Sequence, residues 1–340
     1  MRQMRKRRIY ECFARFCVIF VVTAFLMLTS AYAATFFPTE AKTAEALENE
    51  SDAPSETSVF PDERNETEES ENEESVSEES VQDGTESGDA IPAVNLSQFG
   101  LNETPKLKVI DQTGYSPDPY DYLETPLKTG SVVSGKPTVL IYHTHGTERY
   151  SASSSYADGY EYNTLDTDEN VVAVGDCLAD RLEELGVCAI HDRTMYDADG
   201  YTTAYSRSKK AVRELLSAYP SIKYVIDLHR DSVETGGKQA KTVTLFDADC
   251  AQVMIVVGSD AGGSSHKTWE DNFTAAVRLQ QTMNTLYPTL ARPIYLRTAS
   301  FNQELCAGAL LIEVGTCGNT LDEAKAAAGL LAEAIVNTFR

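Results

Sequence analysis

The sequence lacks the motifs of several large protein classes. It has seven cysteines and five histidines but no CxxC pair, which argues against zinc ribbons, zinc fingers and ferredoxin-type clusters. Neither a GxGxxG motif nor a P-loop occurs, so nucleotide-phosphate binding is not indicated. Basic residues are also scarce, since 29 Lys and Arg stand against 52 Asp and Glu, for a net charge of −23. That balance argues against a nucleic-acid partner, because phosphate contacts need a surplus of basic side chains.

The N-terminal residues have the pattern of a membrane-targeting segment. Residues 1–15 are rich in Lys and Arg, and no charged residue follows Arg15 until Glu40. About 20 apolar residues suffice to span a bilayer. We therefore predict a basic cytoplasmic tail at 1–15 and a single transmembrane anchor at 16–39, which places the rest of the chain outside the cell membrane. A cleaved signal peptide is the alternative, because Ala31-Tyr32-Ala33 resembles a cleavage site.

The next stretch, residues 40–104, is acidic and almost free of aromatic residues. Positions 41–90 alone hold 18 of the Asp and Glu residues. Such a composition cannot bury enough apolar surface to fold, and like charges extend the chain. We predict a disordered acidic linker over 40–104, followed by one folded domain over 105–340.

Within residues 105–340, strand-like and helix-like patterns alternate. The β-prone runs are 138–142, 187–190, 222–228, 242–246, 253–257 and 310–314. Helical periodicity is found at 170–185, 211–218, 269–286 and 324–339. Asp168 and Gly186 are placed to begin and end the first helix, and Thr320 and Glu323 form a capping box before the last. This alternation predicts an α/β fold, with a mostly parallel twisted sheet and helices on both faces.

Groups that bind metals or move protons follow three of the predicted strands. His145 and Glu148 come after the first strand with HxxE spacing, His229 comes at the end of a second, and Glu313 lies in the last. The carboxyl ends of parallel strands meet at one edge of a sheet. Two histidines and a carboxylate with an open fourth position are typical of a catalytic zinc site. We predict His145, Glu148 and His229 as zinc ligands and Glu313 as the general base.

Other residues near these motifs are secondary candidates. His143 competes with His145, because residues two apart on a strand face the same way. Arg230 and Asp231 could orient His229 or bind substrate charge, or they could pair with each other at the surface. The loop 258–263, with Trp269 after it, is a candidate lid or substrate wall, or an ordinary loop before a helix.

These motifs together resemble a known family. The segments in question are Ile141-Tyr142-His143-Thr144-His145 with Glu148, Asn170-Val171-Val172-Ala173-Val174-Gly175, Asp227-Leu228-His229-Arg230-Asp231, Asn302-Gln303, and Leu311-Ile312-Glu313-Val314-Gly315 with Asn319-Thr320. In this order they resemble the stage II sporulation protein P family, from about Leu107 to the C-terminus. Asn302 joins the candidate site residues on this ground. Two positions depart from the expected pattern: Gly146 stands where we expect Thr, Ser or Asn, and Phe301 where we expect Tyr.

The resemblance implies a zinc-dependent peptidoglycan hydrolase related to N-acetylmuramoyl-L-alanine amidases. Such an enzyme cleaves the amide between N-acetylmuramic acid and the stem peptide, and endopeptidase action on cross-links is also attributed to the family. It implies a role in forespore engulfment, with the sporulation proteins D and M as partners. It assigns zinc to His145, Glu148 and His229, and the catalytic role to Glu313.

Two other functions compete with the zinc amidase. A non-catalytic wall-binding or scaffold protein could keep the fold and lose turnover, but the four central residues are all present. A zinc carboxypeptidase uses the same ligand types. It would need a cationic pocket for a free carboxylate, supplied by Arg230 or Arg297.

Overall fold

The computed structural model describes residues 90–155 and 161–340, which belong to one compact unit. The predicted tail at 1–15 and anchor at 16–39 lie outside the described residues, as does most of the linker. Among the helices of the described part, none has both the length and the apolar character needed to cross a bilayer.

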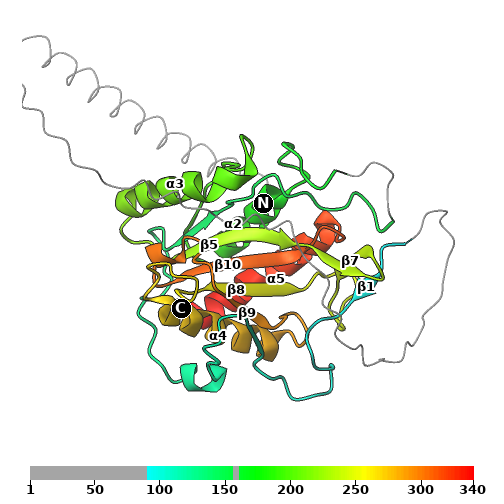
Figure 1. Ribbon diagram of the computed structural model, residues 1–340, viewed down its shortest axis with the longest axis horizontal. Helices are drawn as coiled ribbons and strands as arrows, with labels where there is room; N and C mark the ends of the chain where they lie inside the picture. Colours follow the sequence, from blue (N-terminus) through cyan, green and yellow to red (C-terminus); the bar gives the residue numbers. More distant parts are fainter. Residues whose placement is uncertain (1–89, 156–160) are drawn as a thin grey trace, which may run out of the picture. The chain divides into compact units, whose positions relative to one another are not determined.

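A seven-stranded sheet forms the centre of the fold (Figure 1). Its strands, in spatial order, are β2 (Val109–Asp111), β9 (Ile294–Arg297), β8 (Val253–Gly258), β10 (Ala309–Thr316), β5 (Tyr224–Asp231), β3 (Val139–Tyr142) and β4 (Ala189–His191). Neighbouring strands are parallel except β8 and β10, which are antiparallel. The predicted mostly parallel sheet is therefore confirmed.

Helices cover both faces of this sheet, as predicted. The helices α2 (Val171–Glu184), α4 (Trp269–Leu286) and α5 (Leu321–Phe339) share one hydrophobic core with the sheet. The helix α3 (Ala204–Ala218) packs on the opposite face, where Val212 meets Leu140 and Val225 in a second cluster. Three short 3-10 helices lie in the connections: η1 (Pro119–Tyr122), η2 (Tyr201–Thr203) and η3 (Gln303–Leu305).

Local capping signals explain where several helices begin and end. The capping box of α5 is present, with Thr320 and Glu323 bonded reciprocally through side chain and backbone. Gly186 follows α2 with φ of +81°, the left-handed conformation that ends helices and favours glycine. The N-cap of α2 is Asn170 rather than the predicted Asp168, because the Asn170 side chain accepts a hydrogen bond from the Val172 amide.

A small second sheet contains residues that the sequence analysis had placed in the linker or in another strand. It consists of β1 (Ala93–Val94), β7 (Lys238–Thr242) and β6 (Val233–Thr235), in the order β1-β7-β6. The strand expected at 242–246 is therefore wrong, since β7 ends at Thr242 and belongs to this sheet. The linker boundary at 104 needs correction too, because β1 lies before it and Ile91 and Phe99 are buried.

The loop 258–263 lies away from the edge where the zinc ligands were predicted. β8 runs antiparallel to β10, with Val253 opposite Val314 and Val256 opposite Leu311. The carboxyl end of β8 at Gly258 is therefore beside the amino end of β10. The loop and Trp269 follow at that end, so the interpretation of this region as a lid or substrate wall is wrong.

Candidate functional site

Strand alternation places two candidate residues, His229 and Glu313, on the face that carries α3, together with Asp227. Leu228 and Ile312 belong to the core shared with α2, α4 and α5. Their neighbours Asp227, His229 and Glu313 therefore point toward the α3 face, because successive side chains alternate. His229 and Glu313 are direct partners in the parallel register of β5 and β10. Two residues 84 positions apart thus lie side by side at the carboxyl ends of their strands.

His229 lies between two carboxylates. Its Nδ1 is 3.3 Å from Oε2 of Glu148, and its Nε2 is 2.9 Å from Oδ1 of Asp227. The second contact is a charge contact rather than a well-aligned hydrogen bond. Burial lowers the pKa of His229, but the negative charges of Asp227 and Glu148 outweigh it and raise that pKa well above its usual value. This ring is therefore held at both nitrogens.

Glu148 is brought to His229 by the turn that the HxxE spacing predicted. The amide of Glu148 donates to the carbonyl of His145 at 3.3 Å, which closes a single turn. Its Oε2 accepts a hydrogen bond from the backbone amide of Arg230 at 3.0 Å. Burial raises the pKa of Glu148, yet the charges of His229 and Arg230 bring that pKa below its ordinary value. The Glu148 carboxylate is thus held in its anionic form beside His229.

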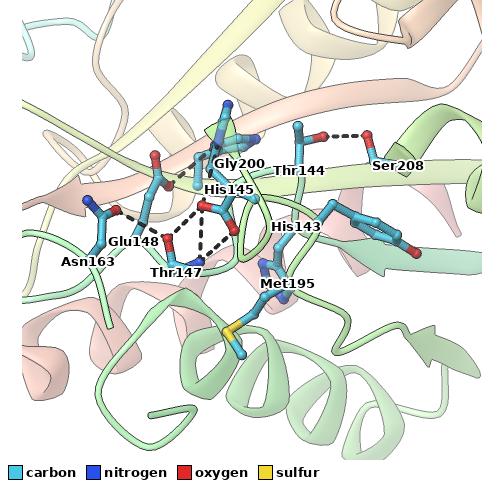
Figure 2. A network of polar contacts seen from close by, with 12 residues as sticks. His143, Thr144, His145, Thr147, Glu148, Asn163, Met195, Gly200 and Ser208 are labelled. Carbon is cyan, nitrogen blue, oxygen red and sulfur yellow. Dashed lines mark hydrogen bonds and ion pairs between the residues drawn. The ribbon is translucent and has the colours of Figure 1, made fainter. Parts of the chain in front are cut away.

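His145 is held by a loop from the neighbouring edge of the sheet. Asp197 approaches Nδ1 of His145 with Oδ2 at 3.7 Å, and accepts from the Thr147 hydroxyl at 2.6 Å. The Tyr201 ring stacks on the imidazole with 4.0 Å between centroids, and Tyr205 meets it edge-on at 5.6 Å. Figure 2 shows His145, Thr147 and Glu148 close together, with Gly200 of the same loop nearby. His145 and His229 lie 5.5 Å apart by ring centroid.

His143 does not join this group, so it is a poor candidate for a ligand. Its Nδ1 is 2.9 Å from the Leu228 carbonyl and its Nε2 is 2.7 Å from Nε2 of His191. The Cβ that Gly175 of α2 lacks would lie 2.7 Å from Nε2 of His143, so this ring faces α2. The argument from strand alternation failed because β3 ends at Tyr142, and His143 and His145 are not on one strand.

Glu313 has the position and the environment of a proton-transfer group. Its Oε2 is buried and has no hydrogen-bond partner among the described residues. Burial, with the neighbouring charges of Asp231 and Glu148, raises the pKa of Glu313 to about 8, although His229 opposes the shift. A buried carboxyl oxygen without a hydrogen-bond partner is costly, and carboxyl groups with strongly shifted pKa values are concentrated at functional sites.

A chain of buried polar side chains supports His229 from behind. Asp227 accepts from the Thr144 amide at 2.8 Å and from the Thr144 hydroxyl at 2.6 Å. The Thr144 hydroxyl is 2.9 Å from that of Ser208 on α3 (Figure 2). Ser208 in turn accepts from the Asn302 amide at 3.1 Å. The secondary candidate Asn302 is therefore linked to His229 through this chain of contacts.

The other secondary candidates have structural partners of their own. The Arg230 guanidinium donates to the carbonyls of Arg149 at 3.1 Å and Tyr162 at 2.8 Å. Asp231 pairs with Arg292, Nη1 to Oδ2 at 2.7 Å. Neither the expected contact with His229 nor the alternative Arg230–Asp231 pair is formed by these side chains.

The types of side chain at this site, two histidines and a glutamate, suit zinc, but their ligand atoms do not all point to one common position. Within residues 90–155 and 161–340, no group of three or more His, Cys, Asp or Glu side chains stands ready to hold a metal ion. Two ligand atoms about 2.0–2.1 Å from a tetrahedral zinc lie roughly 3.3–3.4 Å apart. Nδ1 of His229 and Oε2 of Glu148, 3.3 Å apart, fit that spacing. Asp227 behind His229 is the carboxylate partner that metal-binding histidines commonly have.

Sequence reasoning missed the contribution of the loop from Met195 to Thr203. Asp197 and Tyr201 both contact His145, yet they lie 52 and 56 residues after it. The departure at Gly146 is the signal that could have revealed the loop. A Cβ there would lie 2.7 Å from Cγ of Met195, so the close approach of this loop excludes a larger side chain.

Comparison with known sequences identifies a family match. A family model described as Stage II sporulation protein P matches residues 23–336. A curated relative from Bacillus subtilis (strain 168), "Stage II sporulation protein P", is 30% identical over 212 residues, which cover 58% of this chain and 50% of the relative. The chain thus spans about half the length of that relative.

Comparison with solved structures returns amidases with low overall superposition. N-acetylmuramoyl-L-alanine amidase AmiC2 of Nostoc punctiforme has a TM-score of 0.36 and 14% identity, covering 61% of this chain and 96% of its own. The CwlD amidase from Clostridioides difficile, in complex with the GerS lipoprotein, has a TM-score of 0.37 and 12% identity, covering 58% and 94%.

Proposed function

Because this chain belongs to the stage II sporulation protein P family, we propose that it is a peptidoglycan hydrolase that acts in sporulation. The single observation that carries the proposal is the group at the carboxyl edge of the sheet. There, His229 lies 3.3 Å from Glu148 and is the register partner of Glu313. Asp227, Asp197 and Thr144 hold this group in place from behind.

We propose that His145, Glu148 and His229 hold a zinc ion. When bound, zinc would polarise the scissile carbonyl and acidify a water molecule. The protein itself orients the side chains of two proposed ligands, His229 and Glu148. Asp227 fixes the His229 ring at Nε2, which leaves Nδ1 directed at Glu148. The backbone amide of Arg230 fixes Oε2 of Glu148, so two of the proposed ligand atoms are set before any metal binds.

Glu313 is the proposed general base. Its Oε2 would accept the proton of the attacking water and then give it to the nitrogen of the leaving amine. The β10 register holds this carboxyl beside His229, and the rigid pairing of two central strands keeps it there. Burial raises the pKa of this carboxyl when no metal is bound; the positive charge of a bound zinc would lower that pKa, so that the carboxylate could accept the proton and later release it.

The amide between N-acetylmuramic acid and the stem peptide is the proposed bond. A carboxypeptidase would need a free cation for the terminal carboxylate of its substrate. The Arg230 guanidinium is already bound to two carbonyls, and Arg297 ends β9 at the opposite edge of the sheet. The positions of these two arginines favour an internal amide as the cleaved bond over the terminal peptide bond that a carboxypeptidase cleaves. Anchoring through residues 16–39 in the cell membrane and partnership with sporulation proteins D and M are further proposals, which rest on the family.

One experiment tests the function and the roles together. The full chain would be purified, its zinc quantified, and peptidoglycan fragments released by it identified by mass spectrometry. We expect about one zinc per chain and free stem peptides as the product. Glu313→Gln should keep zinc and lose turnover by at least 100-fold, whereas His229→Ala should lose both. Glu313→Gln with full activity, or products that are single amino acids, would contradict the proposal.

A further inference from the structure

The side chain of Tyr205 lies beside the proposed site residues on the α3 face of the sheet. Tyr205 is in the first turn of α3 and is half-buried. Its ring meets the His145 imidazole edge-on, with 5.6 Å between ring centroids, and it approaches the ring of Phe301 at 6.0 Å. Phe301 packs on the cluster that contains Met254, the register partner of Glu313 on β8. Tyr205 thus lies between the His145 end of the site and the Glu313 end.

The backbone of Tyr205 is fixed by contacts in the first turn of α3. Its carbonyl accepts a hydrogen bond from the side-chain amide of Asn302 at 3.0 Å. In the same turn, Arg207 donates from Nε to the Tyr196 carbonyl at 2.6 Å, which ties α3 to the loop that holds His145. The position of Tyr205 relative to the site is therefore set by the fold and does not depend on a bound substrate.

The Tyr205 hydroxyl lies close to the carboxylates of the site. Burial and the negative charges of Asp227, Glu313 and Glu148 raise the pKa of Tyr205 well above its usual value. Because charge interactions weaken with distance, a hydroxyl that responds to all three carboxylates must be near the centre that they surround. The ordinary pKa of a tyrosine, about 10, already keeps such a hydroxyl protonated at neutral pH. It can therefore act there as a hydrogen-bond donor.

Other donors around the site are already engaged. The hydroxyls of Thr144 and Thr147 donate to buried carboxylates, and the Arg230 guanidinium donates to two carbonyls. Phe301 has no hydroxyl. In the part of the chain that the structure describes, the hydrogen bonds of Tyr205 with other side chains are made by its carbonyl. Its hydroxyl is thus the donor that remains for a substrate.

We propose that Tyr205 is a catalytic residue, whose hydroxyl donates a hydrogen bond to the carbonyl oxygen of the scissile amide. That oxygen gains negative charge as water attacks the carbonyl carbon, and it loses this charge when the carbon–nitrogen bond breaks. A donor placed where charge develops binds the transition state more tightly than the substrate. This inference rests on the proposed peptidoglycan hydrolase function, to which it adds a catalytic donor from α3.

The step balances without a further acid or base. Tyr205 keeps its own proton throughout. One proton of the water passes through Glu313 to the leaving nitrogen, and the remaining hydroxyl stays on the carbonyl carbon as part of the new carboxyl group. The role of Tyr205 is therefore electrostatic, and removal of its hydroxyl alone is enough to test it.

The test separates transition-state stabilisation from substrate binding. In the full chain, kcat and KM are compared between Tyr205 and Tyr205→Phe, with zinc quantified in each protein. The substrate is a soluble peptidoglycan fragment of two disaccharide units that carry stem peptides. Binding of the same fragment is measured by calorimetry in chains that carry Glu313→Gln, with and without Tyr205→Phe. The matched control is Tyr219→Phe, which removes the hydroxyl of an exposed tyrosine at the far end of α3.

We expect Tyr205→Phe to lower kcat about 100-fold, the effect of losing one donor to a developing oxyanion. Zinc content, KM and binding of the fragment should stay unchanged, and Tyr219→Phe should behave as the unsubstituted chain. An unchanged kcat for Tyr205→Phe would overturn the inference. Loss of zinc, or weaker binding that accounts for the whole fall in kcat/KM, would also overturn it, because Tyr205 would then only support His145 or bind the substrate. Failure of the proposed function would appear differently, as an unsubstituted chain that takes up no zinc and releases no fragments.

Discussion

At the scale of single residues, the site is organised by carboxylates that do not themselves belong to the proposed ligand set. Asp227 stands behind His229 and Asp197 stands behind His145. Each of them is fixed in turn by a threonine of the same loop, Thr144 and Thr147 respectively. This repeated arrangement means that the segment 144–147 orients both histidines. It explains why one short turn bears so many polar side chains while remaining almost completely buried.

The role of Asp227 can be measured through the metal. Asp227→Asn keeps an oxygen that can accept from the Thr144 amide, but it removes the negative charge that faces Nε2 of His229. We expect zinc affinity to fall about 10- to 100-fold, as for other partners of metal-binding histidines. Competition with a chelator measures this without reference to activity. Asp199→Asn, which changes an exposed carboxylate of the neighbouring loop, is the control. Equal zinc affinity for Asp227→Asn and the parent would refute the role.

At the scale of elements, α2 carries a glycine where two histidines need space. An ideal Cβ on Gly175 would lie 2.5 Å from Nε2 of His191 and 2.7 Å from Nε2 of His143. The rings cannot easily turn away, because their other nitrogens are held. Nδ1 of His143 contacts the Leu228 carbonyl and Nδ1 of His191 contacts Asp176. The glycine thus allows α2 to pack directly against the end of β3.

We expect Gly175→Ala to destabilise the fold by about 1–3 kcal/mol, the usual cost of overpacking a core. This loss should exceed the gain in helix propensity, which is about 1 kcal/mol for Gly to Ala. The control is Gly329→Ala in α5, where a Cβ meets nothing within 4 Å and only the gain applies. Urea unfolding of both variants gives the free energies directly. A Gly175→Ala protein as stable as Gly329→Ala would show that the histidine pair tolerates a methyl group.

Helices with a clear periodicity or a capping motif could be predicted from the sequence. Features of strands that depend on which strand they pair with could not. The predicted helix at 269–286 coincides with α4, and the capping box of α5 is formed as expected. The strands β2 and β9, of three and four residues, were missed, whereas the equally short β3 and β4 were found at the predicted β-prone runs 138–142 and 187–190. The antiparallel direction of β8 is likewise invisible in a local pattern, since it depends on where the chain returns to the sheet.

The same distinction holds for the candidate site. The proximity of Glu148, His229 and Glu313 could be foreseen. His229 and Glu313 lie near the carboxyl ends of two paired parallel strands, and the HxxE turn that contains Glu148 follows the end of a third. His143 was misjudged because the end of β3 was unknown. Asp197 and Tyr201 were missed because a loop of irregular backbone places them, and its path depends on the tether from Arg207 on α3.

At the scale of the whole molecule, the residues before the predicted domain are part of its structure. The segment 90–104 pairs with β7 through β1 and buries Ile91 and Phe99. Its Leu96 amide donates at 2.7 Å to the side chain of the fully buried Gln252. The small sheet in turn packs against the end of β10, where the Thr316 hydroxyl donates to the Ala240 carbonyl at 2.7 Å. This segment therefore supports the end of the strand that carries Glu313.

Removal of this segment should weaken both stability and the site. A chain that begins at residue 105 exposes the surface covered by Ile91 and Phe99, and it leaves Oε1 of Gln252 without its donor. An unsatisfied buried polar atom costs about 1–3 kcal/mol, and loss of the apolar contacts adds to it. We expect a clear fall in the free energy of unfolding relative to a chain that begins at residue 90, measured in urea. Because the loss acts through the small sheet on β10, peptidoglycan hydrolysis should fall with it. Equal stability of the two chains would mean that the folded unit begins at 105 after all.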